Sequence, residues 1–148
     1  MADYIRNKKV TFDFELLQKY EAGISLLGTE VKAVRKGQGK LDGAHVVIRG
    51  GEAYLTGAAI SPFQKANTKS SYQDDRARKL LLSKKELNEL FLESEKKGLT
   101  IVPIRLYNKG SKLKLEIAVA RGKKKHDKRE TIKARDTKRD IDRLLKSK

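Results

Sequence analysis

Apolar and polar residues alternate in short runs along the first 120 positions, and this pattern predicts β-strands. In the clearest run, Leu113, Leu115 and Ile117 alternate with charged residues. Comparable runs cover residues 20–27, 44–48, 53–56, 99–107 and 112–120. The run at 10–14 alternates in the same way, but a short helix over 12–20 fits its apolar residues about as well. The pattern therefore predicts about six short strands.

Turn-forming residues divide these runs into antiparallel hairpins. Gly50 and Gly51 separate two of the runs, and a Gly-Gly pair accepts the positive φ angles of a tight hairpin turn. The turn at 108–111 joins the last two runs, and residues 57–60 continue toward a third strand. Pro103 has no N–H to donate, so we expect its strand to lie at a sheet edge or to carry a bulge there.

Two further segments have helical patterns. In residues 28–37, Thr29 is the expected N-cap, Val31 and Val34 face the core, and Gly37 ends the helix. The charged side chains of this segment are expected to face solvent or a ligand: Glu30, Lys32, Arg35 and Lys36. A second helix follows Ser83, which forms a capping-box pattern with Glu86, and it ends near Gly98. Its apolar face consists of Leu87, Leu90 and Phe91.

Short strands in hairpins with two or three short helices predict a mainly β fold, a small β-barrel with helices that plug or flank it. The oligonucleotide-binding type is the leading small barrel for a basic protein. A long polar segment, 61–79, interrupts the pattern, and segments of this length are usually functional or disordered. It ends in basic residues that can become ordered on an anion, among them Arg76, Arg78 and Lys79.

Charge divides the chain into a body, 1–120, and a tail, 121–148. The tail has 13 Lys and Arg against 5 Asp and Glu, and it contains few apolar residues. Such a segment cannot bury enough apolar surface to offset the entropy of ordering. Only Ile141, Leu144 and Leu145 have helical spacing. We therefore expect a tail that is disordered when free and becomes helical on a partner.

Composition narrows the function classes. A formal net charge of +16 indicates a polyanionic partner, and no run approaches the ~18 apolar residues of a membrane-spanning helix. No phosphate-binding glycine loop or nucleophile motif is present, and neither His45 nor His126 lies in a metal-ligand pattern. A hydrolase that uses Glu21 or Glu30 would lack a paired acid or nucleophile. The sequence thus predicts a non-enzymatic RNA-binding protein with no cofactor or metal. The absence of cysteine is compatible with the cytoplasm.

Four motifs resemble the small protein B family, the bacterial partner of transfer-messenger RNA. They cover residues 21–24, 28–32, 78–82 and 122–129, and they follow one another in the family's order. The resemblance spans about Asn7 to Arg143 and implies an oligonucleotide-binding-type barrel that holds the transfer-RNA-like part of that RNA. It also implies a tail that enters the stalled ribosome where messenger RNA is missing, in the decoding centre and the messenger channel.

The resemblance also implies site residues. Asn7, Glu21 and the segment around Leu80 match positions of the family's RNA-binding face. The junction used at the decoding centre corresponds to Gly122, Lys123, Lys124, Asp127, Lys128 and Arg129. His126 falls where a ring can stack on a ribosomal base, with a merely solvated ring as the alternative. From charge alone, Lys138 and Arg139 are expected to matter in the messenger channel. The sequence thus predicts a trans-translation factor, expected to be monomeric and cytoplasmic, with a basic structural ribosomal protein as the alternative.

Overall fold

The computed structural model describes residues 3–61 and 71–123, and within them a β-barrel is built from antiparallel strands. The strands are β1 (Asp3–Arg6), β2 (Phe14–Ile24), β3 (His45–Arg49), β4 (Glu52–Thr56), β5 (Arg78–Leu81), β6 (Leu99–Lys109) and β7 (Lys112–Gly122). The helices are α1 (Val10–Asp13), α2 (Gly28–Arg35) and α3 (Lys84–Ser94). The predicted mainly β fold with short helices is confirmed.

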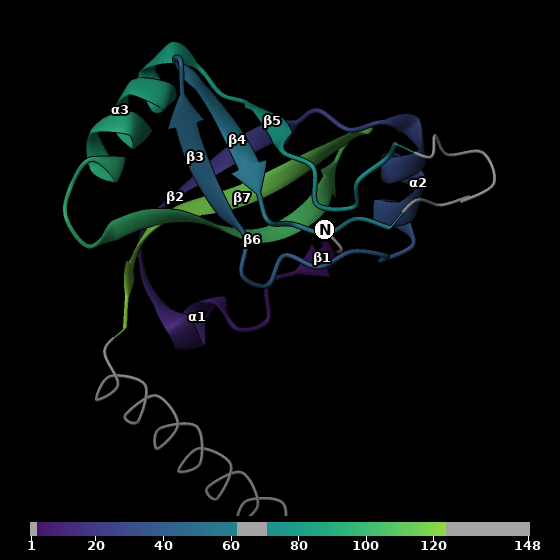
Figure 1. The fold of residues 1–148 in the computed structure, drawn as a ribbon, viewed down its shortest axis with the longest axis horizontal. Helices are drawn as coiled ribbons and strands as arrows, with labels where there is room; N and C mark the ends of the chain where they lie inside the picture. Colours follow the sequence, from purple (N-terminus) through teal and green to yellow (C-terminus); the bar gives the residue numbers. More distant parts are fainter. Residues whose placement is uncertain (1–2, 62–70, 124–148) are drawn as a thin grey trace, which may run out of the picture.

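Strand β6 closes the barrel. The sheet order is β1-β6-β3-β4-β5-β2-β7, and an additional pairing joins β7 back to β6. Along its other edge β6 pairs first with β3, at Ile101, and then with β1, from Arg105 to Tyr107. The predicted irregularity at Pro103 is confirmed, because the β6–β7 register shifts between Pro103 and Arg105. The long strands β2, β6 and β7 form one wall, and α2 and α3 lie at different ends of the barrel (Figure 1).

Inward-facing side chains from all sides fill the barrel. Fully buried residues include Leu55 of β4, Leu106 of β6, Ile117 of β7 and Leu90 of α3. Helix α2 contributes Ala33 and Val34 to the same core. Burial of each large aliphatic side chain stabilises the fold by roughly 1.5–3 kcal/mol relative to its exposure.

The predictions for the two hairpin turns and for the helix cap at Ser83 are confirmed. Gly50 and Gly51 form the β3–β4 turn with φ angles of 59° and 75°, which residues with a side chain rarely adopt. The Ser83 hydroxyl accepts the Glu86 N–H at 3.2 Å, and the Glu86 carboxylate accepts the Ser83 N–H at 3.3 Å. The last hairpin turns at Gly110, between β6 and β7.

Several predicted boundaries differ from the structure. Residues 10–13 form α1 rather than a strand, because Val10 packs into a small separate core with Val102 and Ala120. Residues 57–60 form no strand and contribute only a bridge between Ala59 and Lys40. Helix α2 has Leu27 rather than Thr29 as its N-cap. Two further ends shift: α3 ends at Ser94, and β7 continues to Gly122.

Candidate nucleic-acid interface

A surface groove of about 260 Å³ lies where α2, the end of β2, β5 and the β6–β7 turn meet. Its apolar part is contributed by Ile24, Leu26, Val31, Leu81 and Leu113, and its polar part by Arg35, Ser111 and Lys112, with Gly23 beside them. This set of residues is called the groove below. An apolar surface with cations at its margin suits a nucleic acid, since bases can pack on the apolar part while lysine and arginine meet phosphates.

Gly23 permits the close packing that shapes the groove. It pairs with Leu81 in the β2–β5 register, and a Cβ atom at Gly23 would lie 3.1 Å from the Leu81 Cβ. Any larger residue would therefore force β5 or the Leu81 side chain to shift. Leu81 is 56% exposed and Leu80 only 2%, because neighbouring residues of a strand face opposite sides of the sheet. Within the predicted segment around Leu80, Leu80 itself therefore lies in the core, and Leu81 lies in the groove.

Glu21 extends this face along β2, two residues before Gly23 on the same side of the strand. The Tyr107 hydroxyl donates to Glu21 Oε2, and Lys109 Nζ donates to Oε1 at 3.0 Å. These two hydrogen bonds, with the Tyr107 bond the larger influence, lower the pKa of Glu21 below its ordinary value. Because its side chain is still 37% exposed, the carboxylate retains accessible acceptor positions.

Cations surround the groove from several elements. Arg35 of α2 donates to the Ser111 carbonyl at 3.4 Å, across to the β6–β7 turn. Lys112 lines the groove, and Lys114 pairs with Gly23 in the β2–β7 register. Sequence reasoning predicted Arg35 here but missed Leu81, Lys112 and Lys114. The alternation along this strand could have identified the two lysines, because it places Lys112 and Lys114 on the opposite face from the inward-facing Leu115.

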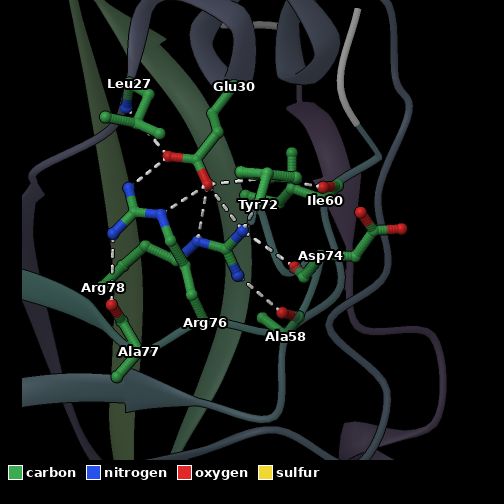
Figure 2. Close-up of polar contacts among 9 residues, drawn as sticks. All are labelled: Leu27, Glu30, Ala58, Ile60, Tyr72, Asp74, Arg76, Ala77 and Arg78. Carbon is green, nitrogen blue, oxygen red and sulfur yellow. Dashed lines mark hydrogen bonds and ion pairs between the residues drawn. The ribbon is translucent and has the colours of Figure 1, made fainter. Parts of the chain in front are cut away.

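A second set of predicted site residues forms a buried ionic cluster. Glu30, Tyr72, Arg76 and Arg78 make this Glu30 cluster, which Figure 2 shows with both guanidinium groups directed at the Glu30 carboxylate. The Glu30 and Arg78 side chains are both 0% exposed, and Arg78 Nη2 lies 2.6 Å from Glu30 Oε2. Arg78 also donates to the carbonyls of Ala58 and Asp74, at 2.7 and 2.8 Å. The cluster thus ties α2 to β5 and to the segment before it.

Every acceptor position of Glu30 is engaged. Arg76 Nε donates to Oε2 at 3.0 Å, the Tyr72 hydroxyl donates to Oε2 at 2.9 Å, and the Leu27 N–H donates to Oε1 at 2.8 Å. Burial raises the pKa of Glu30, but the hydrogen bonds from Arg76, the Leu27 N–H and Arg78 outweigh it and lower the pKa to about 2. A buried carboxylate with all its partners present is stable as an anion.

The structure corrects the predicted exposure of this set. Glu30 and Arg78 were expected to face solvent or RNA, yet both lie in the interior and bind each other. The pattern of a helix with alternating charges could not reveal this, because the partner of Glu30 lies 48 residues away. Arg76 is partly exposed, and Lys79 is exposed and pairs with Glu52 at 2.6 Å.

Of the remaining predicted residues, Lys32 lies on α2 with an exposed side chain, whereas Asn7 and Gly122 lie at the opposite end of β7. Asn7 is 7% exposed, and its Nδ2 donates to the Pro103 carbonyl at 2.9 Å. It lines a separate cavity of about 290 Å³ beside α1, together with Asp13, Asp42 and His45. The Lys123 N–H donates to the Asp13 carbonyl at 2.8 Å, so the chain leaves the barrel next to this cavity. Gly122 ends β7. The other tail predictions lie outside the described residues: Lys124, His126, Asp127, Lys128, Arg129, Lys138 and Arg139.

Among residues 3–61 and 71–123, no three His, Cys, Asp or Glu side chains gather in a way that could hold a metal ion. No helix within the same ranges is long and apolar enough to cross a membrane. The groove offers apolar contact and cations, and the exposed, oriented carboxylate of Glu21 lies beside it.

Comparisons with known proteins agree on one family. The sequence model of a family described as SmpB protein matches residues 4–147. SsrA-binding proteins from Gloeothece citriformis and Gloeobacter violaceus are 46% and 47% identical to the chain; they align with 95% and 96% of it and with 90% and 93% of their own lengths. A solved structure described as "tmRNA-SmpB: a journey to the center of the bacterial ribosome" is similar with a TM-score of 0.68 at 39% identity, covering 86% of this chain and 92% of that one.

Proposed function

The chain belongs to the SmpB protein family, and from that premise we propose that it binds SsrA RNA, the transfer-messenger RNA, and delivers it to stalled ribosomes for rescue and peptide tagging. The relatives are named for SsrA binding, and the similar structure is described with tmRNA and the bacterial ribosome. This favours an RNA-binding factor over the alternative of a structural ribosomal protein. The role is binding rather than catalysis. A ribosomal partner supports our proposal that the protein works in the cytoplasm.

One observation carries the assignment of the RNA site: the groove, with its exposed apolar side chain Leu81, lies beside an oriented carboxylate, Glu21, within a basic surface. Lysines and arginines alone bind any polyanion, with an affinity that falls steeply as salt rises. Glu21 repels phosphate and accepts hydrogen bonds, so it favours an RNA that presents a donor at that place. We propose that this combination holds the transfer-RNA-like part of the RNA.

A titration of labelled transfer-RNA-like RNA tests this site. Glu21→Ala should weaken binding about tenfold although it raises the net positive charge, because a hydrogen bond between RNA and a charged group is lost. Glu15→Ala is the matched control. Glu15 is an exposed glutamate of the same strand, far from the groove, and lies 3.8 Å from Arg121. Equal or tighter binding by the Glu21 variant would refute the assignment.

For the tail, we propose that the cations after Gly122 enter the empty messenger channel of the ribosome. The position of Gly122 at the end of β7 supports a clean experiment, since a chain that stops there keeps every strand of the barrel. That truncated protein should bind transfer-messenger RNA almost as the full chain does, while peptide tagging on stalled ribosomes collapses. Tagging near the full-length level would show that the tail has no such role.

Replacing Asp127, Lys128 and Arg129 together by Ala should give the same separation of RNA binding from tagging. Reversal of the charges of Lys138 and Arg139 should reduce tagging more than Leu144→Ala does, if electrostatic attraction to ribosomal phosphates dominates. The full chain is used in both cases, and RNA affinity measured on the same preparations is the control.

A further inference from the structure

A network of polar side chains crosses the outer face of the barrel beside the groove. It runs over four strands, from Glu21 on β2, past Glu116 on β7, to Tyr107 and Lys109 on β6, and through Arg105 to Asp3 on β1. Each of these residues faces outward, because its strand neighbours, such as Leu115 and Leu106, lie in the core. The network therefore forms a surface of its own, separate from the buried Glu30 cluster.

The register creates an electrostatic conflict that the network resolves. Glu21 lies directly opposite Glu116 in the β2–β7 pairing, and like charges in this arrangement are destabilising. Arg105 neutralises Glu116 at 3.5 Å and Asp3 at 2.6 Å. Glu21 is instead stabilised from β6, across the intervening strand: Lys109 Nζ neutralises it at 3.0 Å, and the Tyr107 hydroxyl donates a hydrogen bond to it.

Tyr107 has little freedom of its own. It is 2% exposed although it lies on the outer face, and the Arg105 guanidinium lies 4.1 Å from its ring centroid. A cation over an aromatic face is attracted to the ring, so this contact helps hold the ring in place. The held ring therefore keeps the phenolic oxygen beside Glu21, whose Oε2 accepts the O–H.

We propose that Tyr107 is a positioning residue for RNA recognition: with Lys109 it holds the Glu21 carboxylate in one orientation as an acceptor for a hydrogen-bond donor of the RNA. The proposal rests on the proposed function, since it assumes that Glu21 contacts RNA. Each carboxylate oxygen accepts about two hydrogen bonds. Tyr107 takes one position on Oε2 and Lys109 one on Oε1, which leaves the outward positions of both oxygens for the ligand.

The ligand group must be a donor, which phosphate is not. RNA offers donors of two kinds, the 2′-hydroxyl and the N–H or amino groups of base edges. An acceptor that is fixed in advance binds such a donor more tightly, because no rotamer freedom is lost when the complex forms. Removal of the Tyr107 hydroxyl should therefore weaken RNA binding without any change in net charge.

The protonation state of Glu21 supplies a second readout. The charged and titratable groups that face it are Tyr107 and Lys109 of β6 and Lys114 and Glu116 of β7. The hydrogen bond from Tyr107 is the largest influence that lowers the pKa of Glu21, and the hydrogen bond from Lys109 is the next largest. Loss of the hydroxyl should therefore raise that pKa toward its ordinary value of 4.5. Since the ionised carboxylate is a much stronger acceptor than the protonated one, acid loss of binding should begin at a higher pH in the variant.

The experiment compares Tyr107→Phe with Tyr20→Phe. Tyr20 is a matched control, because it is 8% exposed and its hydroxyl donates to another glutamate, Glu89, at 3.1 Å. RNA affinity is titrated between pH 4 and 7, and the pKa of Glu21 is followed by carboxyl-carbon NMR of the free protein. We expect Tyr107→Phe to bind about five- to tenfold more weakly, with an unchanged salt dependence and a raised pKa of Glu21. Tyr20→Phe should retain wild-type affinity.

Equal affinities of the two variants, or an unshifted pKa of Glu21 in Tyr107→Phe, would overturn the proposal. If Tyr107→Phe proves unstable, Lys109→Gln repeats the test with a change at an exposed position. It should raise the pKa of Glu21 in the same way. Because it also removes a cation that can contact a phosphate, its salt dependence should be weaker as well. Glu21→Ala separates the two levels of inference, because it removes every acceptor of the side chain. Wild-type binding by Glu21→Ala would refute the RNA contact itself, whereas a tenfold loss beside full affinity of Tyr107→Phe would refute only the positioning role.

Modified RNAs identify the donor. One series replaces single 2′-hydroxyls by fluorine, and the other replaces single guanines by inosine, which lacks the 2-amino group. The modification that removes the contacting donor should cost wild-type protein about five- to tenfold and should cost Tyr107→Phe much less, because the acceptor is already misplaced there. Penalties that are the same in both proteins at every position would overturn the proposal.

Discussion

Glu21 and Glu30 lie in consecutive elements, both accept hydrogen bonds from a tyrosine and a cationic side chain, and both have a lowered pKa. They differ in how many acceptor positions of the carboxylate remain free for a ligand. Glu30 is 0% exposed and its oxygens are occupied by four groups of the protein, whereas the Glu21 side chain is 37% exposed beside the groove. A perturbed pKa therefore does not distinguish a binding carboxylate from a structural one. Unused, accessible acceptor positions do.

The largest expected effect is a loss of stability when Glu30, the buried carboxylate of the two, is replaced. Glu30→Ala leaves the guanidinium of Arg78 buried and without its partner, and breaking a buried pair in this way costs about 3–5 kcal/mol. Urea unfolding should show that loss in the free energy of unfolding. Glu21→Ala is the control, and its unfolding free energy should change by less than about 1 kcal/mol. Comparable losses in the two variants would contradict the assignment of Glu30 to structure.

Acid should weaken the two regions differently. The pKa of Glu30 is about 2 in the folded protein against 4.5 ordinarily, so its stabilisation is complete above about pH 4.5 and is lost as the pH falls toward 2. The size of this contribution is about 3 kcal/mol, at 1.36 kcal/mol for each pKa unit. Unfolding free energies measured between pH 7 and 3 should fall less steeply for Glu30→Gln than for wild type. Glu21→Gln should keep the wild-type slope closely.

The adjacent residues Leu80 and Leu81 allow the interior and the groove to be compared within one strand. Leu80→Ala removes a core side chain and should lower the free energy of unfolding by about 2–4 kcal/mol. Leu81→Ala removes an exposed one and should leave stability nearly unchanged, while RNA affinity falls about fivefold because the apolar part of the groove is smaller. Leu92→Ala, at an exposed position on α3, is the control for a general loss of apolar surface. Equal affinities of the Leu81 and Leu92 variants would place the RNA elsewhere.

The smallest effect concerns Lys79, which was predicted to bind RNA and pairs with Glu52 on the outer face. Lys79→Ala should weaken RNA binding about twofold and reduce the slope of log affinity against log salt by at most about 0.7–0.9, the value for one phosphate contact. Its melting temperature should stay at the wild-type value, since exposed ion pairs contribute little. An unchanged slope would remove Lys79 from the interface.

The sequence by itself determined the local structure of this protein. The hairpin turn at Gly50 and Gly51, the capped start of α3 at Ser83 and the bulge near Pro103 each depend on backbone preferences and hydrogen bonds within a few residues. Apolar alternation likewise located most of β3, β4, β6 and β7. The family motifs added Glu21 as a candidate contact. Such features need no knowledge of distant partners, because the interactions that produce them are short in sequence.

Only the tertiary structure decided which side chains face the groove and which lie inside. Arg78-Lys79-Leu80-Leu81-Leu82 contains three consecutive leucines, so alternation could not show that Leu81, rather than Leu80, is exposed. Likewise, Glu30 is buried because closure of the barrel brings Arg78 to it from 48 residues away. The register of β5 on β2 and the pairing of β7 with β6 fix these facings. A shift of one residue in β5 would reverse the facings of Arg78, Leu80 and Leu81 together, and only long-range pairing sets that register.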